Sequence, residues 1–136
     1  MPAQLNHTIV RSRDKRESAT FVSRILGLPA PVPFGPFLVV EAANGVSLDF
    51  SDGEGDEDIT PQHYAFLVTE DEFDEIFGRI QARRLEYYAD PGGRLKGEIN
   101  RHDGGRGVYW AEPSGHWLEI ITRPYGSGSS YGSGGA

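Results

Sequence analysis

The chain contains no cysteine, few basic residues and no long apolar run, and each absence excludes a class of function. Without cysteine there is no disulfide, thiolate-bound zinc, iron–sulfur cluster or thiol nucleophile. Thirteen Lys and Arg against twenty Asp and Glu give a formal net charge of −7, which argues against a nucleic-acid or anionic-membrane surface. No run approaches the roughly 18 apolar residues of a membrane span, and the N-terminus lacks the apolar region of a signal peptide. We therefore expect a globular, cytoplasmic protein whose chemistry depends on four histidines and many carboxylates.

The length suits one domain, 1–124, with two polar stretches that do not contribute to its core. Tyr125–Ala136 (YGSGSSYGSGGA) is predicted to be a flexible Gly/Ser tail. Ser51–Pro61 (SDGEGDEDITP) is predicted to be an acidic linker. Its alternating acids partly resemble a calcium-binding loop. However, Glu57 stands where the turn glycine belongs and no closing glutamate follows at the required spacing, which favours the linker.

Two segments have the periodicity and end signals of helices. The first is Asp14–Leu26, where Asp14 and Glu17 have the spacing of a capping box. The second begins after Thr69, with Glu72 at the same spacing. Its apolar residues recur at i, i+3, i+4 and i+7, namely Phe73, Ile76, Phe77 and Ile80.

Strand-like runs surround each helix in the same order. In the first half they are residues 5–10, 32–34, 37–42 and 46–50, and in the second half 62–68, 85–89, 107–111 and 116–122. Asn44-Gly45 between two of these runs is a strong hairpin signal. The order is therefore βαβββ twice, in modules 4–50 and 62–123, which predicts an α+β fold with an internal repeat.

Histidines and carboxylates occupy matching positions in the two modules. The first strands carry His7 and His63, and the last strands carry Asp49 and Glu119. Glu119 lies within an apolar run, where an unpaired carboxylate would be costly to bury. Two related modules would bring the four residues together across a shared cup, and two histidines with a carboxylate suit ferrous iron or a related divalent metal. The second module is longer, and its extra residues are assigned to the loop Asp90–Gly105, a candidate lid or rim.

Several phrases of the sequence resemble one known superfamily. GRGVYWAEPSGHWLEII (Gly105–Ile121) is similar to the closing signature of the vicinal oxygen chelate superfamily, and LNHTIV, ILGLP and QHYAFLV match the same pattern. That superfamily includes glyoxalase I, extradiol dioxygenases, fosfomycin-resistance enzymes and bleomycin-binding proteins. The resemblance covers residues 4–123. It implies two βαβββ modules forming paired, curved mixed sheets around a metal-binding cup.

The resemblance also implies a site and an assembly. His7, His63 and Glu119 match the family's metal ligands, and Asp49 falls where glyoxalase-type members use a carboxylate, or else orients a ligand histidine. One divalent metal is expected, with Fe²⁺ or Mn²⁺ favoured and Ni²⁺, Co²⁺ or Zn²⁺ possible. A homodimer is expected, with or without exchange of modules between chains, together with a small-molecule substrate.

Within the superfamily, the resemblance favours an extradiol-dioxygenase-like oxidoreductase with two histidines and one carboxylate. Such enzymes place a tyrosine ten residues before the glutamate ligand, as Tyr109 stands to Glu119, and a histidine upstream, here His102. A catechol-type substrate needs a base for its phenolic proton and a neutral donor for its second oxygen. His102 and Tyr109 are the residues expected to act in catalysis.

Three alternatives remain open at this point. A glyoxalase-like lyase or isomerase would use Asp49 or Glu119 to move a proton, although an aspartate reaches less far than a glutamate. A fosfomycin-type transferase would need a basic, potassium-binding loop that the sequence does not show. A bleomycin-resistance-type binding protein would need an aromatic groove, for which the candidates are Trp110, Trp117, Tyr87 and Tyr88, residues more often found in a core or an interface. His116 is expected to be a structural turn residue.

Overall fold

The computed structural model describes residues 2–53 and 58–128, and the chain divides into two compact units. Unit 1 comprises Met1–Pro61 and Glu112–Gly115, and unit 2 comprises Gln62–Ala111 and His116–Ala136. The centre of the predicted acidic linker, with most of its calcium-like acids, lies outside the described residues, as do residues 129–136 of the predicted tail. No helix within the described ranges combines the length and the apolar character needed to cross a bilayer.

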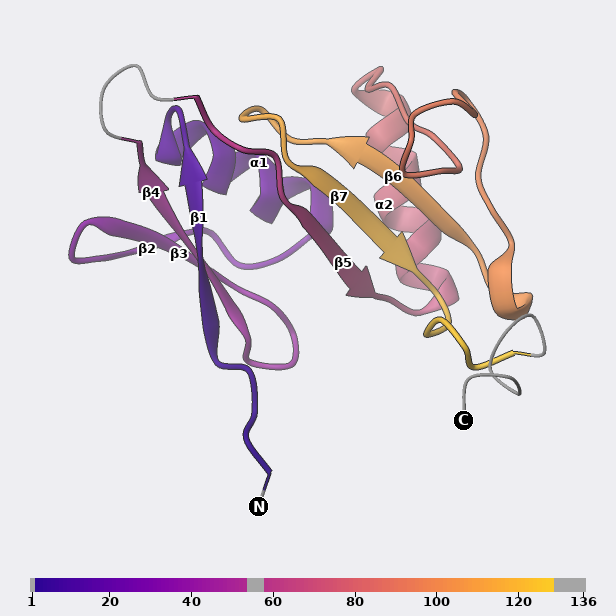
Figure 1. Cartoon of the computed structure of the whole chain (residues 1–136), viewed down its shortest axis with the longest axis horizontal. Coiled ribbons are helices and arrows are strands. Elements are labelled where there is room, and N and C mark those ends of the chain that lie inside the picture. The colour runs from indigo at the N-terminus through magenta and orange to yellow at the C-terminus, as the bar shows by residue number, and fades with distance from the viewer. Residues whose placement is uncertain (1, 54–57, 129–136) are drawn as a thin grey trace. The chain divides into compact units, whose positions relative to one another are not determined.

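Unit 1 has the predicted βαβββ order. Its elements are β1 (His7–Ser12), α1 (Lys15–Leu26), β2 (Val32–Phe34), β3 (Phe37–Glu41) and β4 (Ser47–Asp52). The sheet order is β1-β4-β3-β2, with β1 parallel to β4 and the other neighbours antiparallel, as the indigo and purple strands of Figure 1 show. Because α1 contacts β1, β3 and β4, its apolar side chains are buried against the sheet.

The N-cap of α1 and the hairpin after β3 form as the sequence predicts, and of the capping box predicted for Asp14 and Glu17 the structure shows the Asp14 half. The carboxylate of Asp14 accepts hydrogen bonds from the backbone N–H groups of Arg16 and Glu17 at 3.0 and 3.2 Å. Gly27 ends the helix in the left-handed conformation, with φ of +69°. Gly45, in the predicted Asn-Gly turn, has φ of +87°, which allows β3 and β4 to pair directly.

Unit 2 contains a second mixed sheet. Its elements are β5 (His63–Leu67), α2 (Glu70–Ala82), a short 3₁₀ turn (His102–Gly104), β6 (Gly107–Ala111) and β7 (Trp117–Ile121). The strand order is β5-β7-β6, with β5 parallel and β6 antiparallel to β7. In Figure 1, α2 lies along one face of this sheet. Two mixed sheets with two helices confirm the predicted α+β fold class.

The strand predicted at 85–89 is wrong in its extent. Of residues 85–89, only Tyr88 pairs with β6, through two backbone hydrogen bonds of 2.9 Å to Tyr109. The pairing stops there because the Asp90 carboxylate accepts hydrogen bonds from the backbone N–H groups of Arg94 and Leu95, at 3.0 and 2.8 Å, and turns the chain back. Tyr88 nevertheless occupies the place beside β6 that β2 occupies beside β3 in unit 1.

Both halves of the capping box predicted for α2 are present. The hydroxyl of Thr69 accepts from the backbone N–H of Glu72 at 3.1 Å, and the Glu72 carboxylate accepts from the backbone N–H of Thr69 at 2.8 Å. Phe73, Ile76 and Ile80 of the apolar stripe are buried. The helix therefore begins at a fixed residue and covers the sheet with its predicted face.

Candidate functional site

The histidine and the carboxylate of each unit lie on two neighbouring parallel strands. In unit 1, His7 is opposite Ser47, and Asp49 lies two residues further along β4. In unit 2, His63 is opposite Trp117, and Glu119 lies two residues further along β7. The two pairs therefore have the same register in their sheets, as the predicted internal repeat requires.

This correspondence extends across every strand of both sheets. In each unit the carboxylate belongs to a row of directly paired residues. The row of unit 1 is Ile9, Asp49, Val39 and Val32, and the row of unit 2 is Ala65, Glu119, Tyr109 and Tyr88. Unit 2 therefore presents two phenol-bearing residues in the places where unit 1 presents two valines.

Glu119 is a buried carboxylate with a direct histidine partner. Its side chain is 1% exposed, because Glu119 lies in the centre of the apolar strand β7. Its Oε1 atom is 2.9 Å from Nε2 of His63, whose side chain is 45% exposed. The pair therefore connects the interior of unit 2 with its surface. A carboxylate buried in an apolar strand was expected to have a partner, and His63 is that partner.

Two tyrosine hydroxyls extend the chain of polar contacts that begins at Glu119. The hydroxyl of Tyr125 donates to Oε2 of Glu119, and the hydroxyls of Tyr109 and Tyr125 are 2.9 Å apart. The ring of Tyr109 also lies 5.7 Å from the ring of His63. Burial raises the pKa of Tyr109 to about 12, with the charge of Glu119 acting in the same direction. Burial and the hydrogen bond to Glu119 likewise raise the pKa of Tyr125. Both phenols are therefore neutral at physiological pH.

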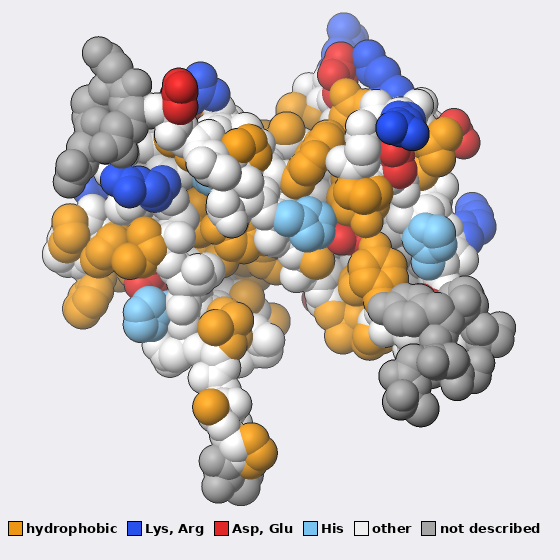
Figure 2. Space-filling model, in the orientation of Figure 1, with side chains coloured by type: hydrophobic (Ala, Val, Ile, Leu, Met, Phe, Trp, Pro, Cys, Tyr) orange, Lys and Arg blue, Asp and Glu red, His pale blue; other side chains and the backbone are white. Residues whose placement is uncertain are grey.

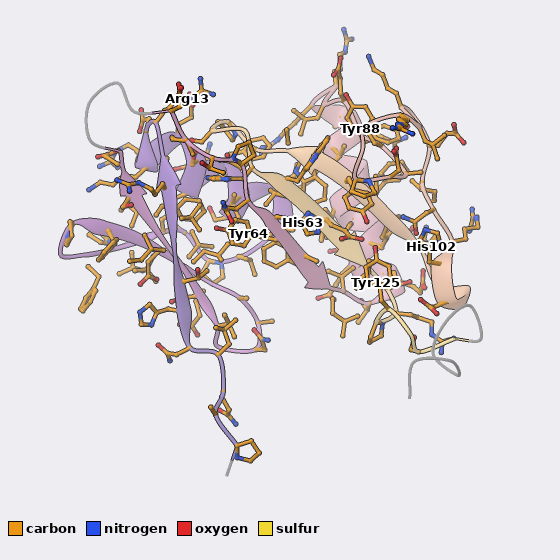
Figure 3. All side chains as sticks on the ribbon, in the orientation of Figure 1. Arg13, His63, Tyr64, Tyr88, His102 and Tyr125 are labelled. Carbon is orange, nitrogen blue, oxygen red and sulfur yellow. The ribbon has the colours of Figure 1, made fainter. Side chains whose placement is uncertain are left out.

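His102 joins this group through Tyr125. It is an exposed residue of the 3₁₀ turn, and its ring centroid is 6.3 Å from that of Tyr125, with the ring planes tilted by 59°. Figure 3 labels His63 on β5, Tyr125 on the segment after β7, and His102 on the turn before β6. In Figure 2, histidine, acidic and hydrophobic side chains adjoin one another on this face of unit 2. Unit 2 therefore brings together His63, Glu119 and Tyr109, with His102 at the edge of the group.

Sequence reasoning did not find Tyr125, which it assigned to the tail. The structure shows a defined segment here, because the Asp103 carboxylate accepts from the backbone N–H groups of Gly126 and Gly128 at 3.3 and 3.0 Å. A tyrosine placed directly before a Gly/Ser stretch was the only available signal. Such a residue has no periodicity that would separate it from the tail.

The pair in unit 1 has different partners. Nδ1 of His7, an exposed residue, is 2.7 Å from the side-chain oxygen of Asn6. Asp49 is 8% exposed, and its Oδ1 accepts a hydrogen bond of 2.8 Å from the hydroxyl of Ser47. Asp49 is therefore held by its own strand, whereas Glu119 is held by residues from two other segments.

The remaining candidates have structural surroundings. His116 is 1% exposed, and its Nδ1 accepts from the backbone N–H of Gln62 at 2.9 Å, as expected of a structural turn residue. Trp110 is fully buried, so it belongs to the core and not to an aromatic groove. Trp117 packs edge-on against Tyr88, with ring centroids 5.4 Å apart.

The His63–Glu119 pair fits half of a divalent-metal site. It offers an imidazole nitrogen and a carboxylate oxygen as neighbours, the donor types that iron and manganese accept. Among residues 2–53 and 58–128, no group of three or more histidine, aspartate or glutamate side chains is placed to hold an ion. The full predicted set, His7, His63, Glu119 and Asp49, therefore remains a prediction, with His63 and Glu119 in contact.

Comparison with known proteins places the chain in one family. The family model described as Glyoxalase/Bleomycin resistance protein/Dioxygenase superfamily matches residues 4–120. The chain is similar to oxidase ChaP-H1, with 62% identity over 92% of this chain and 99% of that one and a TM-score of 0.88. It is also similar to oxidase ChaP-H2, with 60% identity over 95% and 100% of the two chains and a TM-score of 0.90.

A more distant structure shares the fold alone. The fosfomycin resistance protein FosX from Listeria monocytogenes is 23% identical over 91% of this chain and 94% of that one, with a TM-score of 0.65. No curated protein sequence matches the chain. The family match covers nearly the whole chain, and the two oxidases are similar over more than nine tenths of it. Both findings are consistent with the two modules, whose sheets share the same register. The chain belongs to the glyoxalase/bleomycin resistance protein/dioxygenase superfamily, the vicinal oxygen chelate superfamily.

Proposed function

We propose that the protein is a divalent-metal-dependent, extradiol-dioxygenase-like oxidoreductase that acts on a small, oxygen-bearing organic substrate. The observation that carries this proposal is the buried Glu119 carboxylate, joined to His63 on one oxygen and to the phenol of Tyr125 on the other. The similarity to two proteins named oxidases, at 62% and 60% identity, supports an oxidative reaction over the other chemistries of the superfamily.

Members of the superfamily typically use a divalent metal. We propose His63 and Glu119 as ligands in unit 2, and His7 and Asp49 as candidates on the basis of their equivalent register in unit 1. Fe²⁺ or Mn²⁺ suits this combination of donors, and Ni²⁺, Co²⁺ or Zn²⁺ would fit the same donor types. When bound, such an ion would supply a Lewis acid for the oxygen atoms of the substrate and, as iron or manganese, redox chemistry with dioxygen.

The protein's own residues would supply proton handling and orientation. Tyr109 is neutral over the physiological range because burial raises its pKa to about 12, so it can act only as a hydrogen-bond donor or acceptor. His102 is exposed and can exchange a proton with solvent, which suits a base that removes a phenolic proton from a catechol-type substrate. Its ring contact with Tyr125 places it at the edge of the group.

One observation favours a second candidate function, a glyoxalase-like lyase or isomerase. Asp49 is a buried carboxylate, 8% exposed, in the position that corresponds to Glu119. A carboxylate of this kind beside a metal could move a proton between carbon atoms. A non-catalytic binding protein is the remaining alternative, and the experiment below separates the three.

The proposal is tested by the metal content and oxygen consumption of protein purified without chelator. We expect about one equivalent of iron or manganese per site and oxygen uptake with a catechol-type substrate. Both should be lost in His63→Ala and retained in Glu75→Ala, an exposed change on α2. Tight nickel or zinc binding without oxygen uptake would favour the lyase. Failure to bind any divalent ion would contradict the enzyme proposal and leave a binding protein. The expected homodimer and cytoplasmic location remain predictions.

A further inference from the structure

We infer that Tyr125 is a positioning residue for Glu119: its hydroxyl holds Oε2, so that Oε1 beside His63 is the oxygen left for a metal ion. The segment after β7 would then contribute to the metal site by orienting one of its ligands. This inference rests on the proposed function, because it assumes that Glu119 is a ligand. Neither the superfamily match nor the similarity to the oxidases assigns a role to this residue.

The two oxygens of Glu119 have different surroundings. Oε1 lies 2.9 Å from Nε2 of His63, and Oε2 accepts the hydroxyl of Tyr125. A carboxylate at 1% exposure has no access to bulk water, so both oxygens depend on protein partners. Because Tyr125 occupies one oxygen, the carboxylate group is fixed in orientation and offers the other toward His63.

The direction of the hydrogen bonds follows from the number of protons. Tyr125 has a single hydroxyl proton and donates it to Glu119. Any hydrogen bond across the 2.9 Å contact between the two phenols is therefore donated by Tyr109 to the oxygen of Tyr125. Donation from Tyr109 makes the hydroxyl of Tyr125 a better donor, which strengthens its hold on the carboxylate.

The segment that carries Tyr125 is fixed by the turn before β6. Asp103, which is 6% exposed, accepts from the backbone N–H groups of Gly126 and Gly128. Gly128 lies so close to this turn that an added Cβ would be 2.7 Å from Cα of Asp103, a separation that only glycine permits. The guanidinium of Arg123 donates to the carbonyl of Ser127 at 3.3 Å. These contacts are local to the segment and restrict where the phenol can lie.

Tyr125 would orient the Glu119 carboxylate without blocking the approach of a metal ion to it. The side chain of His63 is 45% exposed, so an ion can approach the His63 side of Glu119 without displacing the phenol from Oε2. If Tyr125 were instead a barrier, its removal would make metal binding tighter. The sign of the change in affinity therefore separates the two roles.

The first experiment measures Mn²⁺ binding to the metal-free full chain by electron paramagnetic resonance. Loss of an outer partner of a metal ligand typically weakens metal binding by about 10–100-fold. We expect a loss of that size in Tyr125→Phe, together with a changed spectrum of the bound ion, because the carboxylate is free to rotate. Tyr87→Phe is the matched control, because Tyr87 packs against Phe77 with ring centroids 5.0 Å apart, and its affinity and spectrum should equal those of the wild type.

A second variant tests the segment while leaving both phenols in place. Gly128→Ala should displace the segment from Asp103 and weaken Mn²⁺ binding in the same direction, whereas Ser127→Ala should not. Circular dichroism confirms that each variant is folded. Unchanged or tighter Mn²⁺ binding in Tyr125→Phe would overturn the inference while leaving the proposed function intact. Absence of Mn²⁺ binding in the wild type would instead overturn the proposed function, and the inference with it.

Discussion

Replacing Glu119 by glutamine separates the metal-binding role of this residue from its structural role. The amide has nearly the same volume, and it can accept from Tyr125 and donate to Nε2 of His63. A hydrogen bond to a charged group contributes about 1.5–3 kcal/mol and one between neutral groups about 0.5–1.5 kcal/mol, so weakening both costs about 2–3 kcal/mol. At 1% exposure, burying an amide instead of a carboxylate recovers a similar free energy. We expect the free energy of unfolding of Glu119→Gln to lie within about 1 kcal/mol of the wild-type value.

Metal binding should respond very differently. Glutamine removes the negative charge and turns the donor oxygen beside His63 into an N–H group. We expect Mn²⁺ affinity to fall by more than about 100-fold, beyond the usual effect of losing an outer partner. Urea unfolding of the metal-free protein and isothermal titration with Mn²⁺ measure the two quantities, with Glu75→Gln as the exposed control. Wild-type affinity in a folded Glu119→Gln variant would refute the assignment of Glu119 as a ligand.

Three further predictions concern single residues of unit 2. Thr69→Ala removes the acceptor of the Glu72 N–H and should lower the free energy of unfolding by about 1 kcal/mol in urea, whereas Thr69→Ser should not. Because folding raises the pKa of Tyr109 from 10.0 to about 12, the unfolded chain releases this proton first, so stability should fall as the pH rises from 10 to 12. The fall should be smaller in Tyr109→Phe, and pH-dependent unfolding measures it. Gly107→Ala should destabilise the fold and lower its melting temperature, because the new Cβ would lie 2.8 Å from the buried Asn100 side chain; a melting temperature equal to that of the wild type would contradict this.

The sequence predicts most of the fold because its signals are local. The capping box at Thr69 and the Asn-Gly hairpin before β4 each depend on residues within a few positions of one another, and both are present. The strand at 85–89 is the exception. Its residues have a strand-like composition, but the Asp90 turn, a competing local structure, limits pairing to Tyr88.

The site was predictable only where the repeat constrained it. His63 and Glu119 are 56 residues apart in sequence and still in contact, and the matching positions in the two modules pointed to both. Tyr125 has no counterpart in the first module and no periodicity. Its role depends on Asp103, a residue of a turn with φ of +55° that no sequence pattern predicts, and on the close approach of Gly128.

The reduction of the fourth strand of unit 2 to Tyr88 has a consequence for how this protein can diverge. Two single residues, Tyr88 and Asn100, pair with the edge of β6, each through two backbone hydrogen bonds, so the chain between them carries little of the sheet. Insertions among the exposed residues 94–98 would be tolerated thermodynamically, because lengthening a surface loop costs little, whereas Asn100 and Asp103 are buried. Selection could therefore act on this segment, and on what it contacts, while the paired strands and the buried carboxylate stay unchanged.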